Sequence, residues 1–364
     1  MALSVGIVGL PNVGKSTVFN ALTAGKAEAA NYPFCTIDPN VGIVPVPDAR
    51  LKRIEAKIPT QKIIPAVVEI VDIAGLVKGA SQGEGLGNKF LANIRETNAI
   101  LMMVRCFDDP NVIHVAGAVD PMRDIDIIDL ELALADVESA EKRLKKAQGA
   151  AKTGAKEGKT ELALIEKVYN HLAAGKAARG LELSDDDRKQ VAGMGLLTAK
   201  PVLYCCNVGE GDLPKGNAWS DAVKARAAKE GAGVVVLCGK VESELAELAD
   251  GDRAELLASY SLTEPALATL ARECYRLLGL QSYFTAGEKE IRAWTVKKGA
   301  TAPEAAGVIH SDFERGFIRA QVYGLDDLEK LGSEAGIKSA GKMRIEGKEY
   351  VVQDGDIMHF LHNE

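Results

Sequence analysis

Short apolar runs recur along the first two thirds of the chain and indicate its architecture most clearly. Each run is nearly unbroken, as expected for a strand buried on both faces of a parallel sheet. Helical or loop segments separate the runs, and this alternation is typical of an α/β fold. The predicted strands are residues 3–8, 63–71, 99–107, 200–207 and 233–238.

A different pattern lies between the third and fourth of these strands. Apolar residues at helical spacing, with charged residues between them, cover 130–148, and a second periodic run covers 162–172. The polar stretch 149–159 joins them, so the pattern predicts an antiparallel helical arm inserted in the sheet domain. Ser184, with Asp187 three residues later, predicts the cap of a further short helix. The apolar positions of the first helix are Leu130, Ala133, Val137, Ala140, Leu144 and Ala147.

Basic side chains gather on this arm and towards its predicted tip. They could contact RNA phosphates, or they could form an ordinary solvated helix face. The sequence leaves both interpretations open. The residues concerned are Lys142, Arg143, Lys145, Lys146, Lys152, Lys156 and Lys159.

The C-terminal part has a mixed texture that begins after a predicted helix at 267–278. Residues 301–309, with Pro303 near their start, predict a short helix. The pair Asp354-Gly355 predicts the turn of a terminal hairpin. No catalytic constellation is visible here, so we expect this part to recognise a partner. Its predicted β segments are residues 291–296, 316–322 and 349–361.

Composition narrows the class of protein further. The chain has 364 residues, 47% of them hydrophobic, and a formal charge of −7, which argues against indiscriminate nucleic-acid binding and gives no indication of DNA specificity. No run is long enough for a membrane span, and no secretory signal is visible. The six cysteines lack C-x-x-C and zinc spacing, which predicts buried thiols in a cytoplasmic protein.

A phosphate-binding motif follows the first predicted strand directly. Residues Gly9 to Ser16 fit G-x-x-x-x-G-K-[ST], and a helical segment follows them. This context is the one the motif requires, because backbone N–H groups and a helix N-terminus then surround a polyphosphate. Lys15 is expected to reach the β- and γ-phosphates and is our first catalytic candidate, and Ser16 is expected to hold Mg²⁺. The other residues expected around the nucleotide are Asn12, Val13, Gly14 and Thr17.

Two further segments complete the predicted phosphate and magnesium site. Asp72-Ile-Ala-Gly75 is a D-x-x-G motif at the end of an apolar strand. Its aspartate is expected to bind Mg²⁺ through water, and the Gly75 N–H is expected to meet the γ-phosphate. Thr36, in the polar segment after the first helix, is the candidate to coordinate Mg²⁺ over a triphosphate.

The residue after this motif is Leu76, where many GTPases carry a glutamine that orients the attacking water. Leucine neither donates nor accepts a hydrogen bond, so another group must position the water. His114, in the loop after the strand at 99–107, is a candidate. It is equally compatible with a packing role or a role at a helix start.

The base site is predicted at Asn207-Val208-Gly209-Glu210, where guanine-binding relatives have N-K-x-D. Here the lysine is lost, and the aspartate that would pair with guanine is lengthened to Glu210. The loss of those contacts should reduce guanine selectivity by roughly 10⁴-fold. Gly239 and Lys240, after the last strand, are expected beside the base.

Two segments carry a resemblance to a known family. Residues 75–91, GLVKGASQGEGLGNKFL, resemble the switch region of Obg-type GTPases. Together with residues 31–40, NYPFCTIDPN, and the N-x-x-E pattern, they resemble the YchF branch, the Obg-like ATPases. The resemblance covers nearly the whole chain.

This resemblance implies an organisation and a function. It implies an Obg-type P-loop G domain at 3–256 with a helical insert at about 130–198, a connecting helix at 257–280, and a β-grasp TGS domain at 281–362. It also implies an ATP-preferring ATPase with Mg²⁺ and K⁺, the latter near Asn12. Its partner would be the ribosome, through the large subunit, or another RNA–protein complex.

Two alternatives stay open from the residues. One is an Obg-class GTPase with relaxed base choice, and the other is a binding adaptor whose nucleotide is structural. The presence of Lys15, Ser16, Thr36 and Asp72 favours hydrolysis over the adaptor.

Overall fold

The structure, a computed structural model, describes residues 3–24, 40–73, 85–114, 117–152 and 156–363. It divides the chain into two compact units. The first contains the N-terminal residues, residues 40–42 and residues 69–270, and the second contains residues 43–68 and 271–363. Among the described residues, no helix has both the length and the apolar content that a membrane span requires.

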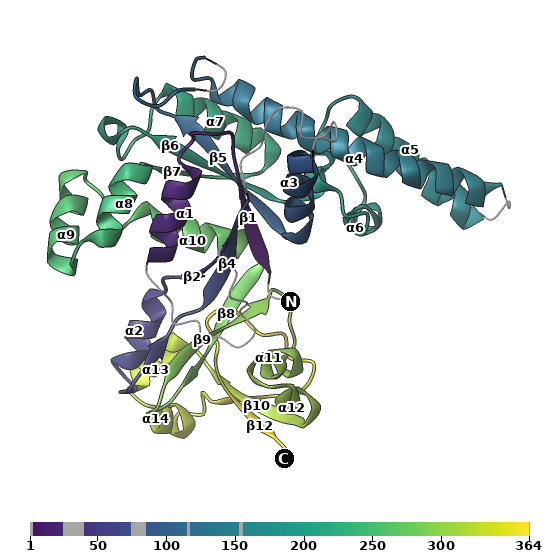
Figure 1. Ribbon diagram of the computed structural model, residues 1–364. Helices are drawn as coiled ribbons and strands as arrows, with labels where there is room; N and C mark the ends of the chain where they lie inside the picture. Colours follow the sequence, from purple (N-terminus) through teal and green to yellow (C-terminus); the bar gives the residue numbers. More distant parts are fainter. Residues whose placement is uncertain (1–2, 25–39, 74–84, 115–116, 153–155, 364) are drawn as a thin grey trace. The chain divides into compact units, whose positions relative to one another are not determined.

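The first unit is built on a six-stranded sheet with the order β2-β4-β1-β5-β6-β7 (Figure 1). β1 runs parallel to both β4 and β5, and every residue of β1, β5 and β6 is buried. The predicted strands are therefore confirmed, except that the run at 63–71 divides into β3 (Ile63–Ile64) and β4. The strands of this sheet are β1 (Ser4–Val8), β2 (Val41–Pro45), β4 (Val67–Asp72), β5 (Ala99–Cys106), β6 (Val202–Val208) and β7 (Gly233–Leu237). The adjacent thiols of Cys205 and Cys206 are buried in β6, as predicted.

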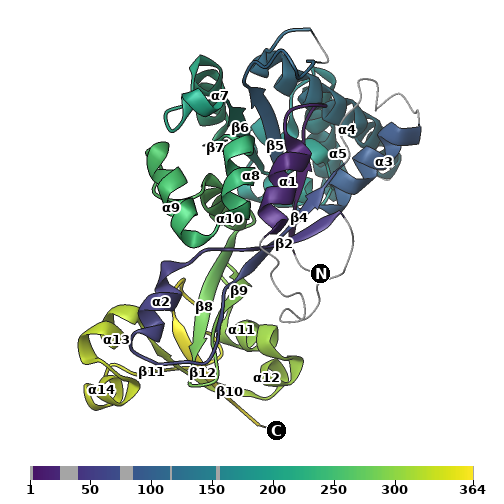
Figure 2. The ribbon, with the colours of Figure 1, turned by 60° about the vertical axis from the view of Figure 1, so that its left-hand side comes forward.

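Helices connect these strands. α1 follows β1 and packs against α8, which follows β7 (Figure 2). This pairing places the N-termini of two helices at the carboxyl end of the sheet, where ligands bind in open α/β folds. The helices are α1 (Lys15–Ala24), α3 (Gly85–Glu96), α7 (Ala218–Glu230), α8 (Gly239–Glu247), α9 (Asp250–Ser259) and α10 (Ala266–Leu277).

The predicted arm is present as two long helices that lie side by side, α4 (Pro121–Ala151) and α5 (Lys156–Ala173) (Figure 1). α4 begins nine residues before the predicted start, because Asp120 caps it and Pro121 occupies its first turn. Leu130 was expected on the buried face but is 49% exposed. Ser184 caps α6 (Asp185–Ala192) by accepting from the Asp187 N–H, as predicted. The core of the arm contains Ala140, Leu164, Val168, Leu172, Ala178, Val191 and Leu196.

The second unit has its own six-stranded sheet, in the order β11-β10-β12-β8-β9-β3. The helix predicted at 301–309 is α11 (Ala302–Ile309), capped by Thr301 and Glu304. Its core joins sheet residues such as Tyr283, Val322 and Met358 to Ala305 of α11. The further elements are β8 (Leu280–Ala286), β9 (Ile291–Lys297), β10 (Phe317–Tyr323), β11 (Arg344–Glu346), β12 (Ile357–His362), α2 (Ala49–Glu55), α12 (Ser311–Arg315), α13 (Leu325–Leu331) and α14 (Glu334–Ser339).

The predicted terminal hairpin is wrong. β12 pairs antiparallel with β10 and parallel with β8, instead of folding back on residues 349–353. The turn itself exists, since Gly355 has φ +94° and donates its N–H to the Ser282 carbonyl. The turn therefore leads the chain into the sheet between two strands that are distant in sequence.

Residues 43–68 belong to this second unit, whereas the predicted boundaries kept residues 3–256 together. β3 pairs parallel with β9, with Ile63 opposite Ile291. On α2, Arg50 contacts Asp354 at 3.0 Å, and Arg53 contacts Glu329 at 2.8 Å. The N-terminal third of the chain thus supplies a strand and a helix to the C-terminal unit.

Candidate active site

The phosphate-binding loop lies between β1 and α1, as the motif predicts. Gly14 has φ +91°, and its carbonyl accepts from the Val18 N–H at 3.0 Å, which starts the helix. Asn12 has φ +63°, a backbone conformation that residues other than glycine seldom adopt. Ser16 and Thr17 are exposed in the first turn of α1. The helix N-terminus and these two hydroxyls together favour an anionic ligand.

Lys15 points to the end of the neighbouring strand. Its Nζ donates to Asp72 Oδ1 at 2.6 Å and to the Ile73 carbonyl at 2.7 Å. The two side chains are only 11% and 21% exposed, so the pair lies in a partly desolvated site. Asp72 stands opposite Ile7 of β1 in the parallel register, which brings the predicted lysine and aspartate together.

Asn207 connects two loops of the site. Its Nδ2 donates to the Val13 carbonyl, and its Oδ1 accepts from the Gly239 N–H, both at 2.9 Å. The side chain is 6% exposed. A Cβ on Gly14 would clash with the Asn207 amide, so glycine is required there for packing as well as for its positive φ. One buried amide therefore fixes the phosphate-binding loop relative to the start of α8.

Glu210 follows β6 in a short 3-10 helix. Its carboxylate accepts from Lys240 Nζ at 2.6 Å and from the Tyr260 hydroxyl at 3.1 Å. These hydrogen bonds, that of Lys240 foremost, lower the pKa of the Glu210 carboxyl. Val208, two residues earlier, is buried at the end of the strand. The carboxylate at the guanine-reading position thus already has two donors.

His114 lies in the segment between β5 and α4. Its Nε2 is 2.9 Å from Asp124 Oδ2, and both side chains are about 5% exposed. The same segment contacts the phosphate-binding loop, because Asn12 Nδ2 donates to the Ile113 carbonyl at 3.1 Å. The ring is therefore held at the first turn of α4, close in sequence to a contact with the predicted nucleotide site.

The buried Arg105, at the end of β5, supports the segment between β5 and α4 through hydrogen bonds. Its guanidinium donates to the Phe107 and Val112 carbonyls at 3.1 and 2.9 Å and lies over the Phe107 ring. A rigid support of this kind fixes the path of the chain between the sheet and His114.

The structure unites most of the predicted site and adds residues that the sequence did not indicate. Lys15, Asp72, Asn207 and Gly239 meet at the carboxyl end of one sheet. Thr36, Gly75 and Leu76 lie outside the described residues. Tyr260 and Asp124 were missed. Tyr260 belongs to no recognisable motif and is fifty residues from its partner Glu210. Asp124 lies in the first turn of α4, a helix that was predicted to begin only at residue 130.

Comparisons with known proteins give consistent results. A family model described as a 50S ribosome-binding GTPase matches residues 4–144. The YchF-GTPase C-terminal model, described as a protein of unknown function, matches residues 280–363. Proteins named ribosome-binding ATPase YchF, from Pasteurella multocida and from Bacillus subtilis, are each 53% identical over the whole of both chains.

A solved structure agrees with the fold. The structure of the Schizosaccharomyces pombe YchF GTPase matches with a TM-score of 0.88 and 39% identity, covering 99% of this chain and 97% of that one. The agreement extends over both units of the chain.

Proposed function

This chain belongs to the YchF family, and from that membership we propose that it is an ATPase that acts as a nucleotide switch on the ribosome. Its bacterial relatives are named ribosome-binding ATPases, whereas the yeast structure is named a GTPase. The choice between adenine and guanine must therefore be argued from the residues of this chain.

The arrangement around Glu210 is the observation that carries the proposal. Guanine recognition needs a carboxylate that accepts from both the N1–H and the N2 amino group of the base. Glu210 is one methylene longer than the usual aspartate, and Lys240 and Tyr260 already donate to it. Adenine has neither of these guanine donors, so the pocket loses nothing by this pairing when ATP binds. The geometry supports ATP over GTP.

The residues present suit Mg²⁺ and a triphosphate. P-loop NTPases typically use this ion, which prefers oxygen ligands. The exposed Ser16 hydroxyl is such a ligand, Thr36 is the second proposed ligand, and the Asp72 carboxylate would hold the ion through water. When bound, the ion neutralises charge on the phosphates. When a triphosphate binds, the Lys15 ammonium would donate to a phosphate oxygen in place of the Asp72 carboxylate. The N–H groups of residues 13–17 would orient the phosphates.

We further propose that hydrolysis by the free protein is slow. Leu76 leaves the attacking water without a side-chain partner. His114 is the proposed substitute, but in this structure its Nε2 faces Asp124. It must turn or move with its segment to reach a water beside the γ-phosphate. K⁺ near Asn12 would add positive charge there. Turnover should lie below the roughly 1–100 s⁻¹ typical of kinases.

The proposed partner is the large ribosomal subunit, contacted through the arm and the C-terminal unit. Lys142 and Lys145 are about three-quarters exposed and pair with the neighbouring Glu138 and Glu141 on α4. Exposed ion pairs of this kind are weak and can be exchanged for RNA phosphates. The proposed domains are a nucleotide domain at 3–256 from which residues 43–68 are excluded, a connecting segment at 257–280 and a TGS-type last domain at 281–362 that residues 43–68 join.

Paired titrations with ATP and GTP test the base choice. Glu210→Asp together with Val208→Lys restores the guanine pattern and should shift preference towards GTP. Glu210→Asp alone should weaken the binding of both ATP and GTP, because it loses the Lys240 and Tyr260 contacts without adding a lysine side chain at position 208. Dissociation constants decide the matter, and an unchanged ATP/GTP ratio in the double variant refutes the role given to Glu210.

Co-sedimentation with ribosomal subunits tests the partner. Reversing the charge of Lys142, Lys145 and Lys146 should weaken binding and reduce its salt dependence, since fewer phosphates are neutralised. Reversal of Lys229 alone, exposed on α7, is the control, and it is matched to reversal of Lys145 alone on the arm. Binding that ignores both salt and the arm variant contradicts the proposal.

A further inference from the structure

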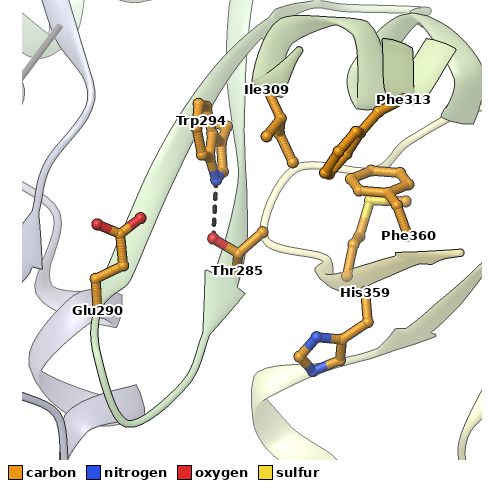
Figure 3. A pocket seen from close by; sticks show the side chains of 8 residues that line it. Thr285, Glu290, Trp294, Ile309, Phe313, His359 and Phe360 are labelled. Carbon is orange, nitrogen blue, oxygen red and sulfur yellow. Dashed lines mark hydrogen bonds between the residues drawn. The ribbon is translucent and has the colours of Figure 1, made fainter. Parts of the chain in front are cut away.

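The second unit has a pocket that takes no part in the nucleotide site. It lies between the sheet and the side chains of Ile309, at the end of α11, and Phe313, on α12, and has a volume of about 300 Å³. This is at the lower end of the range for small-molecule sites, roughly 300–1,000 Å³. Figure 3 shows the side chains that matter here: Thr285, Glu290, Trp294, Ile309, Phe313 and Phe360.

The aromatic walls are held in place by neighbours. The Arg292 guanidinium lies 4.7 Å from the centre of the Trp294 ring. Phe313 stacks on His362 at 3.8 Å with 28° between the rings, and Phe360 packs edge-on against buried Tyr283 at 5.7 Å. The three pocket aromatics remain only partly buried. Flat apolar faces are thus presented in fixed orientations.

One side of the pocket is polar. Trp294 Nε1 donates to Thr285 Oγ1 at 2.8 Å, which leaves the threonine hydrogen for another acceptor. Glu290, 39% exposed, supplies a carboxylate whose two oxygens lie 3.3 and 3.4 Å from Nε and Nη2 of Arg292, and its remaining lone pairs can accept from a ligand. Both groups stand on the Trp294 side, across from Ile309, Phe313 and Phe360 (Figure 3). A ligand edge at this side meets one donor and one acceptor.

We propose that this pocket binds a nucleobase, from single-stranded RNA or from a free nucleotide. A base offers a flat ring for the aromatic walls and an edge with both N–H donors and ring-nitrogen acceptors. An aliphatic side chain would leave Thr285 and Glu290 unused. A cationic ligand would meet the positive charge of Arg292, which already lies against Trp294 and Glu290.

The site goes beyond the proposed ATPase, since it lies in the other unit and uses neither Lys15 nor Asp72. The chain has two tryptophans, Trp219 and Trp294. In a full-length Trp219→Phe protein, Trp294 is therefore the only tryptophan reporter. Adenosine, guanosine, cytidine and uridine are titrated separately, followed by short single-stranded oligoribonucleotides. Nucleosides have no phosphates for the P-loop to hold.

We expect saturable quenching of Trp294 by at least one nucleoside. Phe313→Ala should weaken that binding by about 5- to 150-fold, the range for loss of one stacking partner. Glu290→Gln should change the order of preference among the four bases, because an amide also donates. Glu288→Gln, the same change at an exposed position two residues away, should leave the order unchanged. ATP affinity and melting temperature, measured for each variant, show that the fold is intact.

The two sources of the base are then separated. Oligoribonucleotides that bind more than tenfold tighter than the best nucleoside identify RNA as the ligand, and equal affinities identify a free nucleotide. Absence of quenching by every nucleoside and oligoribonucleotide overturns the proposal. So does quenching that Phe313→Ala leaves unchanged, and a base order that Glu290→Gln leaves unchanged overturns the assignment of the polar side.

Discussion

Replacing Asn207 by alanine removes a side chain that hydrogen-bonds both the phosphate-binding loop and the start of α8. Two hydrogen bonds of 2.9 Å are lost, and the Val13 carbonyl and the Gly239 N–H are left in a buried site. A buried polar group without a partner costs about 1–3 kcal/mol. We therefore expect the free energy of unfolding of the first unit to fall by about 2–6 kcal/mol.

Nucleotide affinity should fall as well, because Val13 belongs to the loop that orients the phosphates. A loss of tenfold or more in ATP affinity corresponds to about 1.4 kcal/mol. Urea denaturation, followed by a probe in the first unit, and calorimetric titration with ATP measure the two effects. Asn20→Ala, an exposed change on α1, is the control and should stay within about 0.5 kcal/mol of the parent.

A second substitution separates the two hydrogen bonds. Asn207→Asp keeps an acceptor for the Gly239 N–H but places a carboxylate oxygen against the Val13 carbonyl. It should destabilise at least as much as alanine, because it also buries a charge. The reasoning is refuted if Asn207→Ala lowers the free energy of unfolding by less than 1 kcal/mol and leaves ATP affinity unchanged, or if Asn207→Asp is tolerated.

Three other substitutions test separate parts of the molecule. Lys15→Ala should abolish ATP binding in calorimetry with little change in circular dichroism; residual binding near the parent affinity would contradict the phosphate role. Lys240→Ala should raise the pKa of Glu210 towards an ordinary carboxyl value, because the strongest donor that lowers it is lost, and an NMR titration that finds no rise would contradict this pairing. Leu172→Ala, in the arm core and 1% exposed, should cost about 2–5 kcal/mol and increase hydrogen exchange in α5 while ATP affinity stays unchanged; equal loss in both would show that the arm is not an independent structural element.

The parts that could be predicted from the sequence are those in which neighbours along the chain determine the structure. Buried parallel strands read as unbroken apolar runs, and the phosphate-binding loop is a contiguous motif beside one of them. Asn207 was also found, because it begins the N-x-x-E pattern at the end of the buried strand β6. Lys240 was expected beside the base because it follows the last buried strand, and its Nζ lies 2.6 Å from the Glu210 carboxylate.

The parts that were missed depend on distant partners. Tyr260 reaches Glu210 from the end of α9, and no local pattern marks it. The turn at Gly355 was predicted from its residues, but the strand pairing after it was not. β12 pairs with β10 and β8, and both partners are distant in sequence from the turn. The apolar Leu130 follows helical spacing and yet remains exposed, so spacing alone did not identify which face of α4 is covered.

The split composition of the second unit has a consequence during synthesis. Residues 43–68 leave the ribosome about two hundred residues before residue 271, where the rest of their unit begins. At about 5–20 residues per second, α2 and β3 wait roughly 10–40 s for β9 and the segments that cover them. During that interval Leu51 and Ile54, buried in the finished protein, lack their final neighbours. A chain that stops near residue 280 would leave Leu51 and Ile54 uncovered permanently. Truncation therefore cannot remove the C-terminal unit without exposing part of its core. The fold of this unit is completed only when its last strand, β12, has been synthesised.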